Sequence, residues 1–300
     1  MHLPFQCMLL ATLLLSNSTA ALRLPSFRNL RRVMSSKTTY NGICLGLPPT
    51  TVLSPLSSPL ILATGSKTRA LIVNSMSLPY TLHTIPIDER NIGYDLRALG
   101  TVASATALVS LLSQSKATPI LQSLTSNTIP DFNSPTALIL TSDQVATHPT
   151  LGILEKAQSL EEAQTFFDAY KAVPCVTTVG AVRITHWPSQ VSVVTTFEAT
   201  VTFGEGRMAA YDAYGGGGGG EGRLLRDLGE GGAPILECAG ALMIENPIVK
   251  TFIDEVAGGE DSVLGLRRES LVVALNKCQE KVRRREEEEE EAVKSNLLKF

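Results

Sequence analysis

The first part of this 300-residue chain lacks acidic residues altogether, and Asp88 is the first of them. Average usage would place several acidic groups in a stretch of that length. Residues 5–15 form an apolar run too short to span a membrane, and residues 22–37 are basic and contain serine. Because this order is typical of a secretory signal followed by a transit peptide, we expect a targeting segment and linker over residues 1–58 and import into a plastid. Translation from Met34, which would give a cytoplasmic product, is the alternative.

Aromatic residues and an excess of positive charge are also lacking. Aromatics make up 5% of the chain, with Trp187 as the one tryptophan, and the formal net charge is −3. These values argue against a base-stacking platform and against a partner that is a nucleic acid polymer. No apolar run is long enough for a membrane span in the mature chain.

Cysteine is present but forms no recognisable motif. The five cysteines are scattered, without a CxxC pair or the spacing of a metal site, which favours isolated thiols in a reducing compartment. They are Cys7, Cys44, Cys175, Cys238 and Cys278.

From residue 59 onward, short apolar runs alternate with helical patterns, which predicts an α/β fold. The Val/Thr-rich runs 176–184 and 191–203 predict a hairpin that turns at residues 186–189. The other expected strands are 60–63, 80–84 and 136–145, and the expected helices cover 94–124, the stretch after Ser159, and the chain from about Leu266.

Two segments are low in complexity. Gly215–Gly220 is a run of six glycines inside a glycine-rich stretch, 204–232. A phosphate cradle is conceivable there, but no P-loop Lys-Ser/Thr follows, so a flexible insertion is favoured. Residues 282–300 are rich in arginine and glutamate and predict a charged C-terminal tail or solvated helix.

The run Thr136–Val145 is the most informative part of the sequence. It is apolar, favours a strand and ends in Ser142-Asp143-Gln144-Val145. A buried strand that ends in a carboxylate can aim it into a site at the edge of a sheet; the alternative is an aspartate that caps a turn.

Three sequence blocks in order resemble the Maf-like family of nucleoside triphosphate pyrophosphatases, in its plant or algal-type branch. They are Ser142–Val145, Glu155-Lys156 with the following helix, and Cys238–Leu266. The resemblance implies a domain over 59–281 with a mixed, curved sheet and flanking helices of the Maf/ITPase-like type. It also implies hydrolysis of a nucleoside triphosphate to the monophosphate and pyrophosphate, a Mg²⁺ or Mn²⁺ cofactor, and a homodimer as one expected state.

The same resemblance assigns the candidate catalytic residues. Asp143 and Glu89 match positions that bind metal or activate water, and two carboxylates with phosphate oxygens suit Mg²⁺. Lys156 matches a lysine implied to contact phosphate. Plain surface roles are the alternatives for Glu89 and Lys156.

Ser66 and Arg69 lie between a strand and a helix, where backbone N–H groups can meet a phosphate. They and Gln144 are the expected substrate contacts, together with Glu245, which occupies the position that distinguishes base preferences in the family. A carboxylate only accepts hydrogen bonds, so Glu245 favours the N–H donors of guanine, and the positive charge of 7-methylguanine strengthens that preference. An exposed glutamate before a turn is the alternative.

Two departures from the family pattern support a second hypothesis. The family usually has two consecutive arginines where this chain has Arg69 followed by Ala70. It also tends to have a lysine in the helix after residues 87–89, where the best-aligned residue is Thr106 and the nearest lysine is Lys116. These differences leave two functions open: a pyrophosphatase for a modified nucleotide such as 7-methyl-GTP, or a catalytically impaired nucleotide-binding or regulatory relative.

Overall fold

The computed structural model describes residues 56–213, 222–230 and 234–297, all within the unit Tyr40–Phe300. The predicted targeting segment lies almost wholly outside these residues, and so does Gly215–Gly220. Plastid import and a flexible glycine run therefore stay predictions. In the part of the chain that the structure describes, no helix combines the length and apolar character needed to cross a membrane.

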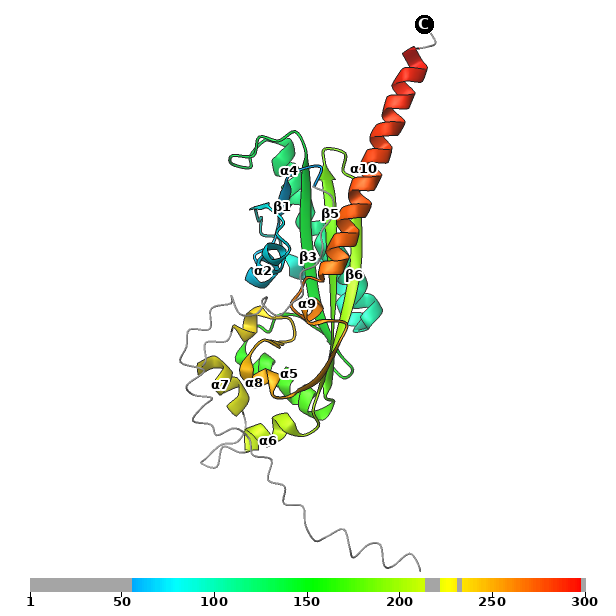
Figure 1. The fold of residues 1–300 in the computed structure, drawn as a ribbon. Helices are drawn as coiled ribbons and strands as arrows, with labels where there is room; N and C mark the ends of the chain where they lie inside the picture. The colour runs from blue at the N-terminus through cyan, green and yellow to red at the C-terminus, as the bar shows by residue number, and fades with distance from the viewer. Residues whose placement is uncertain (1–55, 214–221, 231–233, 298–300) are drawn as a thin grey trace, which may run out of the picture. The chain divides into compact units, whose positions relative to one another are not determined.

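A mixed sheet of seven strands forms the centre of the fold and is not closed into a barrel (Figure 1). Its order is β2-β1-β3-β5-β6-β7, with β4 paired to β3; β1 runs parallel to both its neighbours, and the remaining pairs are antiparallel. The predicted α/β class with a mixed sheet and flanking helices is confirmed. The strands are β1 Leu60–Leu62, β2 Tyr80–Leu82, β3 Ala137–His148, β4 Gly152–Leu154, β5 Cys175–Trp187, β6 Ser192–Phe203 and β7 Ile253–Ala257.

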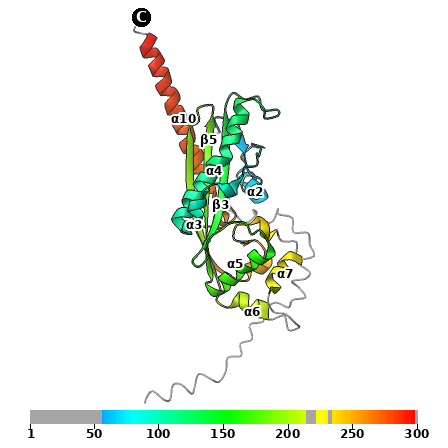
Figure 2. The same ribbon diagram turned by 180° about the vertical axis from the view of Figure 1, so that it is seen from behind.

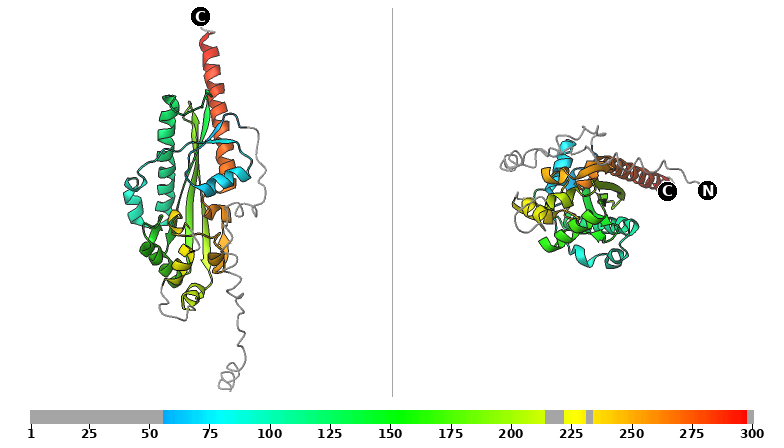
Figure 3. Two further views of the ribbon diagram at one scale, coloured as in Figure 1. Left: turned by 90° about the vertical axis from the view of Figure 1, so that its left-hand side faces the viewer. Right: turned by 90° about the horizontal axis from the view of Figure 1, so that it is seen from below.

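The two faces of the sheet are covered by different helices, as Figures 2 and 3 show. On one face, Leu138, Leu140 and Val182 pack against α2 (Lys67–Ser75) and α10 (Arg268–Leu297). On the other face, alternate strand residues such as Ile139 and Ala181 meet α4 (Val102–Thr125). The alternation of side chains along each strand supplies both apolar surfaces.

The predicted hairpin is confirmed; β5 is longer than expected, and β6 begins one residue later than expected. β5 and β6 pair from Cys175↔Thr202 to Thr185↔Ser192. The apolar Val, Ile and Phe of this hairpin alternate with Thr and Ser, which is the pattern from which it was predicted.

The prediction of one helix over 94–124 is wrong in its continuity. Helix α3 (Tyr94–Leu99) ends at Gly100, whose φ of +63° is the left-handed conformation that glycine adopts without strain. Helix α4 then begins with a capping box between Thr101 and Ser104. In the segment after β1, Ser66 caps helix α2, which begins at Lys67. Arg69 therefore lies within this helix and not before it.

The glycine-rich stretch 204–232 is also more ordered at its ends than predicted. It contains α6 (Arg207–Ala213) and α7 (Arg223–Glu230), on either side of the glycine run. Buried Met208, Leu224 and Leu228 anchor these helices, because apolar side chains hold them to the fold where composition alone suggested a loop. The Asp212 carboxylate accepts a 2.9 Å hydrogen bond from the backbone N–H of Leu224.

The remaining helices connect and close the sheet. Helix α10 continues through the predicted charged tail to Leu297, with Val282 still buried against the sheet. The others are η3 Glu89–Asn91, α5 Leu160–Ala172, η4 Ile235–Glu237, α8 Pro247–Lys250 and α9 Glu260–Val263.

Candidate active site

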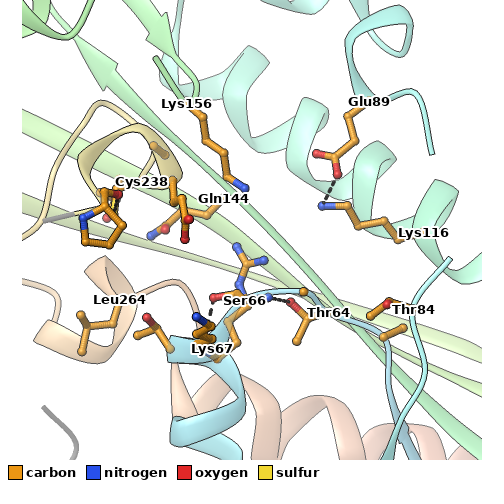
Figure 4. A pocket seen from close by; sticks show the side chains of 18 of the residues that line it. Thr64, Ser66, Lys67, Thr84, Glu89, Lys116, Gln144, Lys156, Cys238 and Leu264 are labelled. Carbon is orange, nitrogen blue, oxygen red and sulfur yellow. Dashed lines mark hydrogen bonds and ion pairs between the residues drawn. The ribbon is translucent and has the colours of Figure 1, made fainter. Parts of the chain in front are cut away.

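A cavity of about 680 Å³ opens where β1 ends beside β3 (Figure 4). Its walls come from the segments that follow β1 and β2, from the chain before α8, and from the end of α9. The basic side chains that line it are Lys67, Arg69, Lys116 and Lys156, and the acidic ones are Glu89, Glu237 and Glu245. Such a concentration of cations suits an anionic ligand.

Asp143 lies inside strand β3 and not at its end, so the sequence prediction is wrong on this point. Strand β3 continues to His148, and Asp143 is paired with Ala181 of β5. The parallel pairing with β1 stops at Leu140, because β1 has only three residues. Asp143 therefore lies just beyond the end of β1 and is 5% exposed; of the described residues that line the cavity, its neighbour Gln144 is one and Asp143 is not.

Lys116 of α4 joins the two predicted metal-binding carboxylates. Its ammonium group forms an ion pair with Asp143 Oδ1 and a second one, at 3.1 Å, with Glu89 Oε1. Figure 4 shows Glu89 and Lys116 facing each other across the cavity wall. The structure thus brings together Asp143 and Glu89, which lie 54 positions apart in the sequence.

Burial is the main influence on the Asp143 carboxyl group and raises its pKa above the ordinary value. The positive charges of Lys116 and Arg69 act in the opposite direction, and the negative charge of Glu89 adds to the rise. A carboxylate with a raised pKa is a stronger proton acceptor than an exposed one, which suits a group that activates water.

The lysine that the sequence comparison missed is Lys116. The best-aligned residue, Thr106, lies on the same helix but about 15 Å away by helical rise, and its hydroxyl only returns to the Val102 carbonyl. One signal was present in the sequence: Lys116 is the only charged side chain in α4. A single ammonium on a helix that packs against the sheet needs an acidic partner.

Arg69 is turned toward the backbone as well as toward the cavity. Its Nε donates to the carbonyl of Gly265 at 2.9 Å, and its Nη1 donates to the carbonyl of Ser142 at 3.1 Å. Gly265 has φ +99°, and a Cβ there would lie 3.1 Å from Arg69 Nε, so this approach requires glycine. Burial lowers the pKa of Arg69, while Asp143 and Glu89 raise it.

Ser66, the other residue predicted in this loop, also lines the cavity. Its hydroxyl accepts a 3.3 Å hydrogen bond from the Arg69 N–H and caps α2. Lys67, the next residue, is exposed at the cavity. The loop therefore presents a helix N-terminus and an ammonium group to the same space.

Lys156 reaches the cavity from the segment after β4, and its side chain is exposed. The preceding residue, Glu155, forms a two-pronged ion pair with Arg97 of α3, at 2.7 and 2.8 Å. The same guanidinium donates to the backbone carbonyl of Glu89 at 3.0 Å. Arg97 thus ties the segment that carries Lys156 to the segment that carries Glu89.

Gln144 and Glu245 both line the cavity but have different surroundings. The Gln144 amide donates to the carbonyls of Ser262 and Val263 at 2.7 and 3.0 Å, so its donor group holds α9 in place. Glu245 lies before α8 and is partly buried; burial raises its pKa, and Lys250 acts to lower it. A hydrogen bond from its own backbone N–H also acts to lower the pKa of this carboxyl group.

Comparison with known proteins assigns the chain to a family. The family model described as Maf-like protein matches residues 59–278, and the chain belongs to this family. Its members are generally nucleotide pyrophosphatases, which agrees with the cationic cavity. The curated proteins contain no match to the chain.

Proposed function

We propose that this protein hydrolyses a nucleoside triphosphate to the monophosphate and pyrophosphate. The observation that carries the proposal is the pair of ion contacts from Lys116 to Asp143 and Glu89, at the wall of a cavity that also holds three further cations. Two acids beside cationic groups supply what attack on a phosphoric anhydride requires: a water-activating base and donors for the leaving group.

A divalent cation fits this arrangement. Asp143 and Glu89 both contact the Lys116 ammonium group, so the two carboxylates lie close enough to each other to contribute ligands to one cation beside it. Among the residues that the structure describes, no three His, Cys, Asp or Glu side chains form a metal cage. Mg²⁺ commonly binds through one or two carboxylates and completes its ligands with water and substrate phosphates. When bound, Mg²⁺ or Mn²⁺ supplies charge neutralisation of the phosphate oxygens.

Each charged side chain at the cavity then has its own role in the proposed hydrolysis. Asp143, whose pKa is raised by burial, takes a proton from water, and Lys116 keeps the two carboxylates together. Lys67 and Lys156 are exposed in the cavity and hold the charge of the departing pyrophosphate. Arg69 adds positive charge at the floor between them.

Mutation of Asp143 tests the activity. Release of pyrophosphate with Mg²⁺ is measured over a panel of nucleotides for the wild type and Asp143→Asn. A metal-dependent release that the variant loses supports a pyrophosphatase. Tight nucleotide binding without pyrophosphate release, in both proteins, supports the non-catalytic relative instead. The family tends to have a lysine where this chain has Thr106, and Lys116 supplies an ammonium group from the same helix. This observation supports the catalytic function.

For the substrate, we propose a modified guanine nucleotide of the 7-methyl-GTP type. The partly buried Glu245 lines the cavity as an acceptor and can pair with the N1–H and N2–H₂ groups of guanine. The positive charge of a 7-methylguanine base strengthens this contact and favours the ionised carboxylate.

Glu245→Gln tests the base preference because it keeps the shape and removes the charge. We expect kcat/KM for 7-methyl-GTP to fall roughly ten- to a hundredfold, which corresponds to about 1.5–3 kcal/mol for a charged hydrogen bond. Hydrolysis of UTP should fall less. A ratio of the two rates that is the same in wild type and variant would remove Glu245 from base recognition and leave the hydrolytic function untouched.

A further inference from the structure

A second cavity, of about 670 Å³, lies between the C-terminal half of α4 and the β5–β6 hairpin. It is separate from the first cavity, which Lys116 and Lys156 line, and the two have no lining residue in common. Its lining comes from Gln114, Ala117, Thr118, Leu121, Gln122, Thr125, Ser126, Arg183, Thr185, Gln190 and Ser192.

Hydroxyl and amide groups dominate this lining. Arg183 of β5 is the one charged residue in it, and none of the described residues that line the cavity is acidic. The first cavity differs, since its lysine on α4 faces two carboxylates. A volume of this size holds a small organic molecule.

Arg183 is partly buried and makes three hydrogen bonds, all to neutral groups. Its Nε donates to Ser113 Oγ at 3.3 Å, its Nη1 to Ser192 Oγ at 2.9 Å, and its Nη2 to the carbonyl of Ser110 at 3.2 Å. A guanidinium has five N–H donors, so two remain. Within the described part of the chain, these two donors have no partner and the guanidinium forms no ion pair.

Among the described residues this half-buried charge has no acidic partner, so part of its cost of burial is not offset by an ion pair. Its three neutral acceptors hold the group in a fixed orientation on the strand. Burial also lowers the pKa of Arg183, and no nearby acid counters this effect. A bound anion would supply the missing negative charge.

We propose that this cavity is a second binding site, which takes a small molecule that carries an oxyanion. Arg183 contacts the anionic group, since the planar fork of its N–H groups matches two oxygens of a phosphate or a carboxylate. The hydroxyl and amide side chains around it, from Thr118, Gln122 and Gln190, suit a polar remainder such as a sugar. The site is independent of the proposed hydrolysis.

The experiment follows backbone and guanidinium NMR signals of the full chain during titration with inorganic phosphate, at constant ionic strength. Site-resolved signals separate this cavity from the first one, which also attracts phosphate. We expect the signals of Gln114–Ser126 and Arg183–Ser192 to move saturably. A parallel titration with acetate distinguishes the two sources: stronger binding of phosphate indicates a phosphate ester, and stronger binding of acetate a carboxylate.

Two variants give the proposal its control. Arg183→Gln removes the charge, and Thr118→Glu adds a carboxylate at an exposed position of α4 that lines the same cavity. Each should weaken the binding at least tenfold. Ala107→Glu adds the same charge to an exposed position of the same helix, outside the cavity, and should leave binding unchanged. Thr118→Glu keeps Arg183 and its hydrogen bonds, so it remains informative if Arg183→Gln lowers the stability.

Saturable shifts that both cavity variants weaken support the site. The absence of shifts at these residues in the wild type would overturn it. Shifts that persist in Thr118→Glu and Arg183→Gln would also overturn it, because they would show that phosphate acts elsewhere.

Discussion

The two walls of the first cavity are built in different ways. The sheet wall consists of Lys116 and Arg69, which lie on two helices, together with the buried Asp143 of strand β3, which forms an ion pair with Lys116. The loop wall consists of Glu89, Lys156 and Glu245, which lie in short connections. The Asp143 side chain is 8% exposed and that of Lys116 is 17% exposed, whereas that of Glu89 is 45% exposed. We infer that the sheet wall fixes the reacting groups and the loop wall adapts to the substrate.

The largest effect is expected from the sheet wall itself. Asp143→Asn should lower kcat about a hundred- to ten-thousandfold, because it removes the proposed proton acceptor and a proposed metal-binding charge. KM and the melting temperature should change little, since the shape is kept. Steady-state kinetics with Mg²⁺ provide the measurement. Activity within tenfold of the wild type would contradict the role of the sheet wall.

The same substitution on the two walls sharpens the comparison. Lys116→Met should lower kcat by about a hundredfold, since Asp143 and Glu89 then repel each other without the shared ammonium. Lys156→Met removes an exposed lysine of the loop wall and should mainly raise KM. Equal effects of the two variants on kcat would show that the walls do not differ in function.

Arg97 links two segments of the loop wall, and its loss should give a smaller effect. In the wild type, the forked guanidinium of Arg97 binds Glu155 through two N–H groups and also donates to the carbonyl of Glu89. Arg97→Lys keeps the positive charge but loses this fork. We expect kcat/KM to fall about tenfold, through less precise placement of Glu89 and Lys156.

The matched control for Arg97 is Arg90→Lys. Arg90 is exposed and directly follows Glu89, so the same substitution there should leave the kinetics unchanged. If Arg97→Lys behaves like this control, the two segments are placed by other contacts.

The smallest effect is expected at the glycine run Gly215–Gly220. Deletion of Gly215–Gly220 should change the free energy of unfolding by less than about 1 kcal/mol, because closure entropy depends weakly on loop length. The hydrogen bond from Leu224 to Asp212 already holds the two flanking helices together. Chemical denaturation measures the change, and a loss of several kcal/mol would show that the run is structural.

The sequence predicted much of the sheet, because apolar and polar residues alternate clearly in β5 and β6. It also pointed to Glu89 and Lys156, which line one cavity, and to Asp143, which contacts Lys116 of the same cavity; their roles stay predictions. It did not predict that Lys116 pairs with Asp143, because that contact depends on where α4 begins, and the break at Gly100 sets this. The ion pair between Arg97 and Glu155 joins residues 58 positions apart, so no local sequence pattern could predict it.

Helix α10 shows that the folded unit extends beyond the region of family similarity. The family match ends at residue 278, yet Val282, one turn further, is buried in the core. Arg285 then donates to the carbonyl of Ser189 at 2.9 Å, in the turn of the β5–β6 hairpin. A chain shortened to the matched region would expose the apolar surface that Val282 covers and would favour aggregation. A recombinant protein should therefore keep helix α10 at least through Arg285, rather than stop where the similarity ends.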